Sequence, residues 1–254
     1  MRPVTTALLA LTMITSTLPA AERDTRCFEM RVYFAAEGKL DDLNTRFREH
    51  TCKLFEKHGM QNIGYWMPID NPQRKLVYLL AYPSREAREK SWKAFMADPD
   101  WQKASKASEV NGKLVAKAES HFLTPTDYSP EIKPTVMSPD RVFELRTYTA
   151  SAGNLAALDT RFRDHTIKLF SKHGMQHVGY WHLMPDQKAA DITLVYLLAH
   201  KSKADADASF AAFRADPNWV SVRKASEDKA GGSLTIPDGV KSEFLKPTDY
   251  SQTK

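Results

Sequence analysis

The sequence has few of the residues that mark the common catalytic and metal-binding templates. It contains two cysteines in 254 residues, with no Cys-x-x-Cys pair. Its ten glycines nowhere form a phosphate-binding loop, and Ser, His and Asp do not stand in a hydrolase arrangement. These absences argue against the common hydrolase, nucleotide-binding and redox templates, and we expect no metal site.

Long runs of one charge sign are missing as well. The 36 Lys and Arg residues are accompanied by 31 Asp and Glu residues, and the net charge is only +5. Bases and acids alternate, as they do between Arg85 and Lys90. That mixture is typical of a solvated helix surface, whereas a nucleic-acid footprint needs clustered Lys and Arg with little acid between them. We therefore expect no nucleic-acid partner.

Only the N-terminus carries an extended apolar stretch. Arg2 precedes the apolar residues 7–14, and residues 18–20 (Leu-Pro-Ala) come just before the polar Glu22. This layout is typical of a signal peptide and is too short to span a bilayer as a stable helix. We predict a signal peptide over residues 1–20 and an exported protein, periplasmic or secreted, without a transmembrane segment. The alternative is a disordered or weakly membrane-anchored tail.

The most informative feature is an internal repeat. Matching segments, given as first copy and second copy, are 28–33 and 143–148, 45–51 and 160–166, 57–61 and 172–176, 77–81 and 195–199, and 125–129 and 247–251. The unit is longer than any solenoid repeat, so each copy is a whole domain. We predict domains over 27–129 and 141–251, joined by a proline-containing linker over 130–140.

The two cysteines lie in the first copy only. Cys27 and Cys52 stand where the second copy has Val142 and Ile167. A cysteine that replaces a β-branched apolar residue is more often a small buried hydrophobe. We favour two free thiols, although an oxidising compartment would also permit a bridge.

Each copy predicts the same order of elements, βαββαβ. In the first copy, alternation predicts a strand over 28–34, helical spacing predicts a helix over 38–58, and a hairpin follows over 63–69 and 75–82. Ser84 caps a second helix, Asp98 and Pro99 start a short third one, and residues 119–123 form the last strand. The fold class is therefore α+β, two tandem ferredoxin-like domains. Each sheet would have one bare face, and the two faces would cover each other.

The ordered motifs resemble the NIPSNAP family. They are Phe-Glu-x-Arg-x-Tyr, a helix with Arg-x-x-x-His, His-Gly-Met, Gly-Tyr-Trp, Asp-Pro-x-Trp and the closing Pro-Thr-Asp-Tyr-Ser, each present twice. The resemblance covers nearly all of the chain after the signal peptide. It implies a dimeric α/β barrel formed within one chain, an internal pseudo-dimer, with further oligomerisation left open. The wider superfamily includes small-molecule monooxygenases and enzymes that use haem.

Charged and aromatic side chains on the first strand of each copy are the candidate ligand-binding residues. We assign them to the sheet face that turns toward the other copy, which predicts a polar barrel lumen holding a small apolar or anionic molecule. The candidates are Glu29, Arg31, Tyr33, Glu144, Arg146 and Tyr148.

Other interpretations of these residues stay open. In one alternative, Arg31 and Arg146 each form an ion pair with the glutamate of the opposite copy. These pairs would fix the alignment of the two halves without binding a ligand. His50 and His165 are further candidates, as a base or a haem ligand. The leading function is a binding or interaction protein. The alternative is a cofactor-independent or haem-assisted monooxygenase or isomerase, in which Glu29 or Glu144 would abstract a proton while Arg31 or Arg146 held the substrate.

Overall fold

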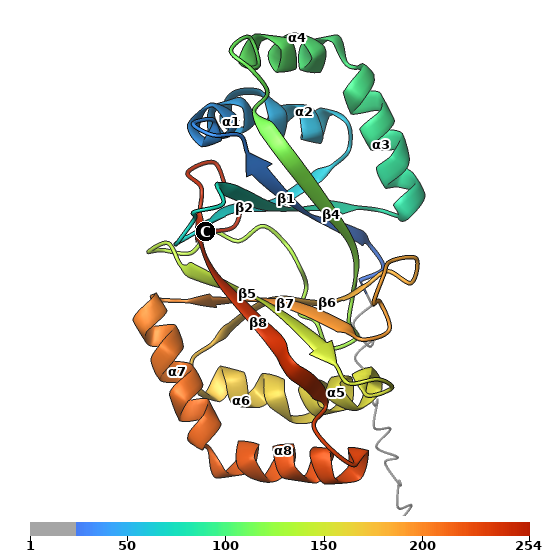
Figure 1. Ribbon diagram of the computed structural model, residues 1–254, viewed down its shortest axis with the longest axis vertical. Coiled ribbons are helices and arrows are strands. Elements are labelled where there is room, and N and C mark those ends of the chain that lie inside the picture. The colour runs from blue at the N-terminus through green and yellow to red at the C-terminus, as the bar shows by residue number, and fades with distance from the viewer. Residues whose placement is uncertain (1–23) are drawn as a thin grey trace, which may run out of the picture.

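The computed structural model describes residues 24–254, so the predicted signal peptide lies outside the described residues. Each half is a four-stranded antiparallel sheet with all its helices on one side, and the two sheets face each other (Figure 1). The first half comprises β1 (Cys27–Ala35), α1 (Leu40–Arg46), the π-helical turn η1 (Phe47–Thr51), α2 (Cys52–Lys57), β2 (Gln61–Pro68), β3 (Lys75–Tyr82), α3 (Arg85–Ala97), α4 (Pro99–Ser108) and β4 (Val115–Pro125). The second half comprises β5 (Val142–Ala150), α5 (Leu155–Arg161), the π-helical turn η2 (Phe162–Thr166), α6 (Ile167–Lys172), β6 (Gln176–Leu183), β7 (Thr193–His200), α7 (Lys203–Ala215), α8 (Pro217–Ala230) and β8 (Thr235–Pro247).

The eight strands close into one barrel in the order β1-β3-β2-β8-β5-β7-β6-β4. Within each half the order is that of a ferredoxin-like sheet. The long last strand of each half then extends beyond its own sheet, so that β4 pairs with β6 and β8 pairs with β2. β4 is longer than the predicted strand over 119–123 at both ends, because residues 115–118 continue its pairing with β1 and residues 124–125 pair with β6. The predicted fold class, an intramolecular dimeric α/β barrel, is confirmed.

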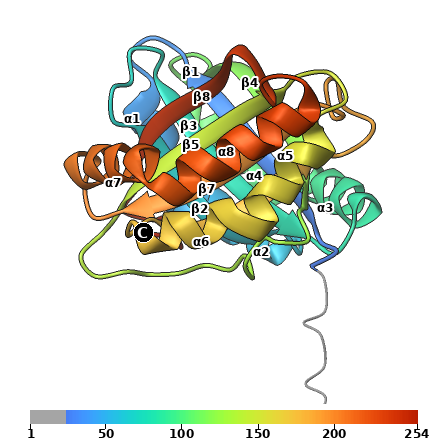
Figure 2. The same ribbon diagram turned by 90° about the horizontal axis from the view of Figure 1, so that it is seen from below.

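Local sequence signals determine where the outer helices begin. Ser84 accepts a hydrogen bond from the Ala87 amide at the start of α3. Asp98 accepts one from the Asp100 amide at the start of α4, where Pro99 occupies the first helical turn. The matching residues do the same at α7 and α8, and together α5 to α8 cover one side of the second sheet (Figure 2). No helix within residues 24–254 is long and apolar enough to cross a membrane.

The interior of the barrel is apolar and filled, which corrects the predicted polar lumen. Phe28, Met30, Phe143 and the two indoles Trp66 and Trp181 meet there in one cluster, with a free space of only about 10 Å³ among the central side chains. That is about the minimum for a single water molecule. A charged side chain in this closed interior could pair only with the equivalent side chain of the other half. On the other face of the sheet, which the helices cover, several hydrogen-bond donors are available to it. The alternation in the first strand is confirmed, but the prediction that Glu29 and Arg31 face the other copy is wrong, because Phe28 and Met30 face it instead.

The Gly-Tyr-Trp motif makes this packing fit. A β-carbon at Gly64 would lie 2.4 Å from the Trp66 ring, and one at Gly179 would lie 2.4 Å from the Trp181 ring. Glycine is therefore required so that each indole can fold back over its own strand and fill the barrel.

The closing Pro-Thr-Asp-Tyr-Ser motif of each half forms hydrogen bonds and an ion pair with the other half. Tyr128 donates a 2.6 Å hydrogen bond to Asp159, and the Ser129 hydroxyl accepts one from the Tyr180 amide at 3.0 Å. Asp127 forms a two-bond ion pair with Arg163. The second motif makes the equivalent contacts to the first half through Asp249, Tyr250 and Ser251. The two closing motifs thus join the halves reciprocally, and we call their residues, 125–129 and 247–251, the clasp.

Cys27 and Cys52 are both buried and unbridged. Burial raises the pKa of the Cys27 thiol to about 11 and that of Cys52 to about 12. These thiols are packing residues, as the comparison with Val142 and Ile167 indicates.

Candidate functional site

The predicted strand residues lie between sheet and helices, in two separate places. Glu29 is fully buried beneath α3 and accepts hydrogen bonds from two guanidinium groups, Arg31 at 2.6 Å and Arg88 at 2.6 and 2.9 Å. Further donors to its carboxylate are Tyr82, Trp92 and Ser120. The alternative of ion pairs across the pseudo-dyad is therefore wrong, because each glutamate pairs within its own half.

These donors decide the protonation state of Glu29. Burial alone would raise the pKa of this carboxyl, but the hydrogen bonds and charges of Arg88, Arg31 and Ser120 outweigh it and lower the pKa to about 2. The carboxylate is fully engaged by the protein. In the first half, Glu29 is thus a structural anion that holds α3 on the sheet.

The second half has fewer donors around the equivalent Glu144. Its carboxylate accepts from Arg146 and Ser242 at 2.5 Å each and contacts His200 at 3.2 Å. The residues that match Arg88 and Tyr82 are Ala206 and His200. Burial opposes ionisation here too, and His200, Arg146 and Ser242 lower the pKa of Glu144 below its ordinary value. Among residues 24–254, Arg146 is the one arginine that contacts this carboxylate.

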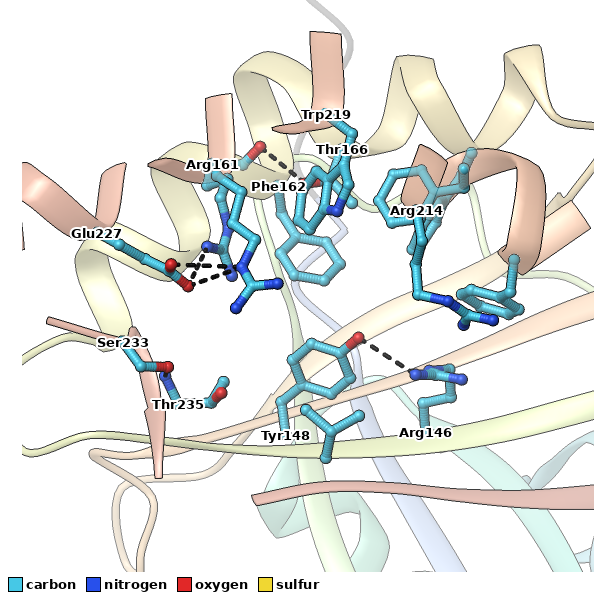
Figure 3. Close-up of a pocket in the computed structure, with 15 residues that line it drawn as sticks. Arg146, Tyr148, Arg161, Phe162, Thr166, Arg214, Trp219, Glu227, Ser233 and Thr235 are labelled. Carbon is cyan, nitrogen blue, oxygen red and sulfur yellow. Dashed lines mark hydrogen bonds and ion pairs between the residues drawn. The ribbon is translucent and has the colours of Figure 1, made fainter. Parts of the chain in front are cut away.

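A cavity of about 260 Å³ lies beside Arg146, between the second sheet and helices α7 and α8 (Figure 3). That volume is near the lower limit of small-molecule pockets, which range over about 300–1,000 Å³. Its wall is strongly aromatic and carries four arginines and one glutamate. The lining residues that matter below are Arg146, Tyr148, Arg161, Phe162, Thr166, Phe210, Arg214, Trp219, Arg223, Glu227, Ser233 and Thr235.

The π-helical turn η2 places two of these side chains. Arg161 and Thr166 are five residues apart, and a regular helix of 3.6 residues per turn would send them to different faces. Here both line the cavity, and the Thr166 hydroxyl donates to the Arg161 carbonyl at 3.1 Å. Widened turns of this kind are frequent at functional sites.

Arg161 is a buried cation with weak compensation. Its side chain is only 6% exposed, and its nearest carboxylate oxygen, on Glu227, is 3.7 Å away. Its Nε has no hydrogen-bond partner. Burial lowers the pKa of Arg161 more than the charge of Glu227 raises it. An anion in the cavity would add negative charge beside this guanidinium.

Two of the four arginines are particular to the second copy. Arg214 stands where the first copy has Met96, and Arg223 stands where it has Ser105. Arg223 pairs with Glu227 at 3.1 Å. Arg214 is exposed at the cavity and has no ion pair with any residue from 24 to 254. The second copy has therefore gained positive charge at this cavity.

The structure separates the predicted candidates. Arg146 and Tyr148 line the cavity, and Glu144 lies directly behind Arg146. Arg31 and Tyr33 lie in the first half, where Arg31 stacks on Trp92 at 4.4 Å. The residues missed by the sequence were Arg161, Arg214, Arg223 and Glu227. A comparison of the copies would have found Arg214 and Arg223, since each replaces a neutral residue.

The two predicted histidines lie away from this cavity. His50 has a half-exposed side chain near Glu49, and His165 is exposed along a groove between α5 and α8. Neither imidazole is enclosed as an axial haem ligand is, so these two histidines do not fit that role. Residues 24–254 also contain no group of three His, Cys, Asp or Glu side chains suited to a metal ion.

The family model that matches this chain is NIPSNAP, over residues 28–130 and 143–252. An uncharacterised NIPSNAP-like domain protein from Burkholderia xenovorans is 21% identical, with 46% of this chain and 98% of that chain covered and a TM-score of 0.39. No curated protein matches.

Two further solved structures cover nearly the whole barrel. A candidate monooxygenase from Lactobacillus acidophilus is 10% identical, with 91% and 95% of the two chains covered and a TM-score of 0.54. An anthrone oxidase-like protein is 12% identical, with 89% and 92% covered and a TM-score of 0.56. At these identities the likeness concerns the fold alone.

Proposed function

Since this chain belongs to the NIPSNAP family, with one domain in each half, we propose a function for the site that distinguishes its two copies. The second half binds a small organic anion with an apolar body in the cavity beside Arg146. The first half serves as the scaffold that closes the barrel. This places the predicted ligand-binding site between sheet and helices instead of in the lumen.

The observation that carries the proposal is the excess of arginine in an aromatic cavity. Arg146, Arg161, Arg214 and Arg223 face one lining carboxylate, that of Glu227, and Glu144 behind Arg146 supplies a second negative charge. Guanidinium groups match the planar geometry of a carboxylate. The aromatic walls would bury the body of the ligand, and its anionic group would complete the hydrogen bonding of the arginines.

The test is a thermal-shift and calorimetric comparison of benzoate with benzamide, its neutral counterpart, on the full chain. Benzoate is expected to raise the melting temperature and benzamide to leave it unchanged, because only a ligand that binds the folded state stabilises it. Equal shifts with both compounds would contradict the proposal.

Matched variants connect binding to the cavity. Replacing Arg214→Met and Arg223→Ser together installs the residues of the first copy, so the fold should persist. Each lost charge-assisted hydrogen bond is worth about 1.5–3 kcal/mol, so benzoate affinity should fall roughly tenfold or more. The control removes the same charge from exposed positions of α4, by Lys103→Met with Lys106→Ser, and should bind like the parent chain.

A second candidate is oxygenase or isomerase chemistry on the bound anion. It is favoured by Tyr148, which lines the cavity and whose hydroxyl accepts a hydrogen bond from Arg146 at 3.3 Å. A phenol held in this way is placed to exchange a proton with a bound molecule. Tyr148→Phe should retain binding and abolish conversion of any ligand that the parent chain turns over. Conversion at an unchanged rate would remove this role.

Export remains a proposal that rests on residues 1–20. We infer that the chain is cleaved after Ala20 and acts outside the cytoplasm. The intact mass of the protein isolated from its native cell should correspond to loss of these residues, and a mass that retains them would contradict export.

A further inference from the structure

We propose that the cavity of the second half selects a dianion, namely a small dicarboxylate with a flat, apolar body between its two charges. This rests on the anion-binding function proposed above and specifies the class of ligand.

One end of the cavity retains a single positive charge after its internal pairing. Arg161 and Arg223 share the carboxylate of Glu227, at 3.7 and 3.1 Å. Two cations and one anion leave one charge without compensation. Ser233 and Thr235 lie at the same end and add hydroxyl groups (Figure 3).

The opposite end shows the same balance, built from different residues. Arg146 is neutralised by Glu144, at 2.5 Å. Arg214 lies beside it (Figure 3) and has no carboxylate partner among residues 24–254. This end therefore also retains one positive charge.

Aromatic rings separate the two ends. Tyr148 and Phe162 lie between the Arg161 side and the Arg146 side of the cavity (Figure 3), and Phe210 packs under the Arg146 guanidinium at 4.4 Å. A monoanion could satisfy only one end, whereas a dicarboxylate would compensate both and lay its body against the rings.

The experiment measures binding of terephthalate and isophthalate to the full chain by calorimetry. Each diacid is compared with its own monoamide, which keeps the shape and removes one charge. We expect at least one diacid to bind tenfold or more tightly than its monoamide, a difference of about 1.4 kcal/mol. Two single variants, Arg214→Met and Arg223→Ser, each neutralise one end, and each should bring this ratio close to one.

The outcomes separate this inference from the function on which it rests. If benzoate or a monoamide binds but no diacid exceeds its monoamide, the second anionic group is not recognised and the dianion inference is wrong, while anion binding stands. If a diacid preference survives in either single variant, the two-ended assignment is wrong. If no carboxylate binds at all, the proposed function falls and this inference falls with it.

Discussion

Replacing Glu29→Gln should destabilise the protein far more than its size change suggests. The carboxylate is the common acceptor for Arg31 and Arg88 beneath α3. A neutral amide would leave Arg31 buried without a counter-charge and Arg88 with only the exposed carboxylate of Glu89. A pKa lowered from an ordinary 4.5 to about 2 corresponds to about 3 kcal/mol of folding free energy. Losses of 3–5 kcal/mol are typical when one partner of a buried ion pair is removed.

The matched control is Glu144→Gln in the second half. Glu144 binds one arginine, so we expect the unfolding free energy of this variant to fall less than that of Glu29→Gln. The two losses should differ by about 1 kcal/mol or more. Urea unfolding followed by tryptophan fluorescence at pH 7 measures both losses. Equal losses would refute the assignment of the extra stability to Arg88.

The pH dependence of the unfolding free energy tests the Glu29 assignment independently. Because the pKa of Glu29 is lower in the folded state, its contribution to stability is fully present above about pH 4.5 and disappears as the pH falls through about 2. The difference in unfolding free energy between the parent chain and Glu29→Gln should therefore shrink between pH 5 and pH 2. A difference that stays constant over this range would show that the ion pairs do not cause it.

Two further predictions concern the packing of the barrel and of the first half. Gly179→Ala should lower stability by about 1–3 kcal/mol in thermal unfolding, because its β-carbon would overlap the Trp181 ring; Gly232→Ala, which has open space around it, is the control and should cost much less. Cys27 and Cys52, with thiol pKa values raised to about 11 and 12, should not react with a disulfide reagent at pH 8 in the native chain and should both react in urea. Fast labelling of the native chain would contradict their burial.

The two copies have diverged at the helix side of the sheet while keeping the contacts that join them. The clasp residues remain reciprocal in both directions, so they preserve the barrel. Two positions differ beside the buried glutamate: His200 and Ala206 replace Tyr82 and Arg88, so Glu144 has fewer hydrogen-bond donors than Glu29. Two others differ at the cavity, where Arg214 and Arg223 replace Met96 and Ser105 and add positive charge. Such a division fits a duplicated protein in which one copy supplies the scaffold and the other supplies the site.

The sequence by itself determined the local structure and the repetition. Ser84 and Asp98 begin helices because their side chains accept hydrogen bonds from free amides of the first turn, and that requires only nearby residues. The alternation from residue 28 to 34 specifies a strand for the same local reason. The NIPSNAP resemblance and the two-domain barrel followed from motifs that recur in order.

Only the tertiary structure decided which face of each sheet points inward. Alternation defines two faces but not their neighbours, because those come from distant segments. The faces that carry Phe28 and Phe143 pack against each other, since apolar rings can fill a closed barrel interior without needing hydrogen-bond donors. The face with Glu29 and Glu144 turned to the helices, where guanidinium groups could compensate the buried charge, and the candidate site moved with it.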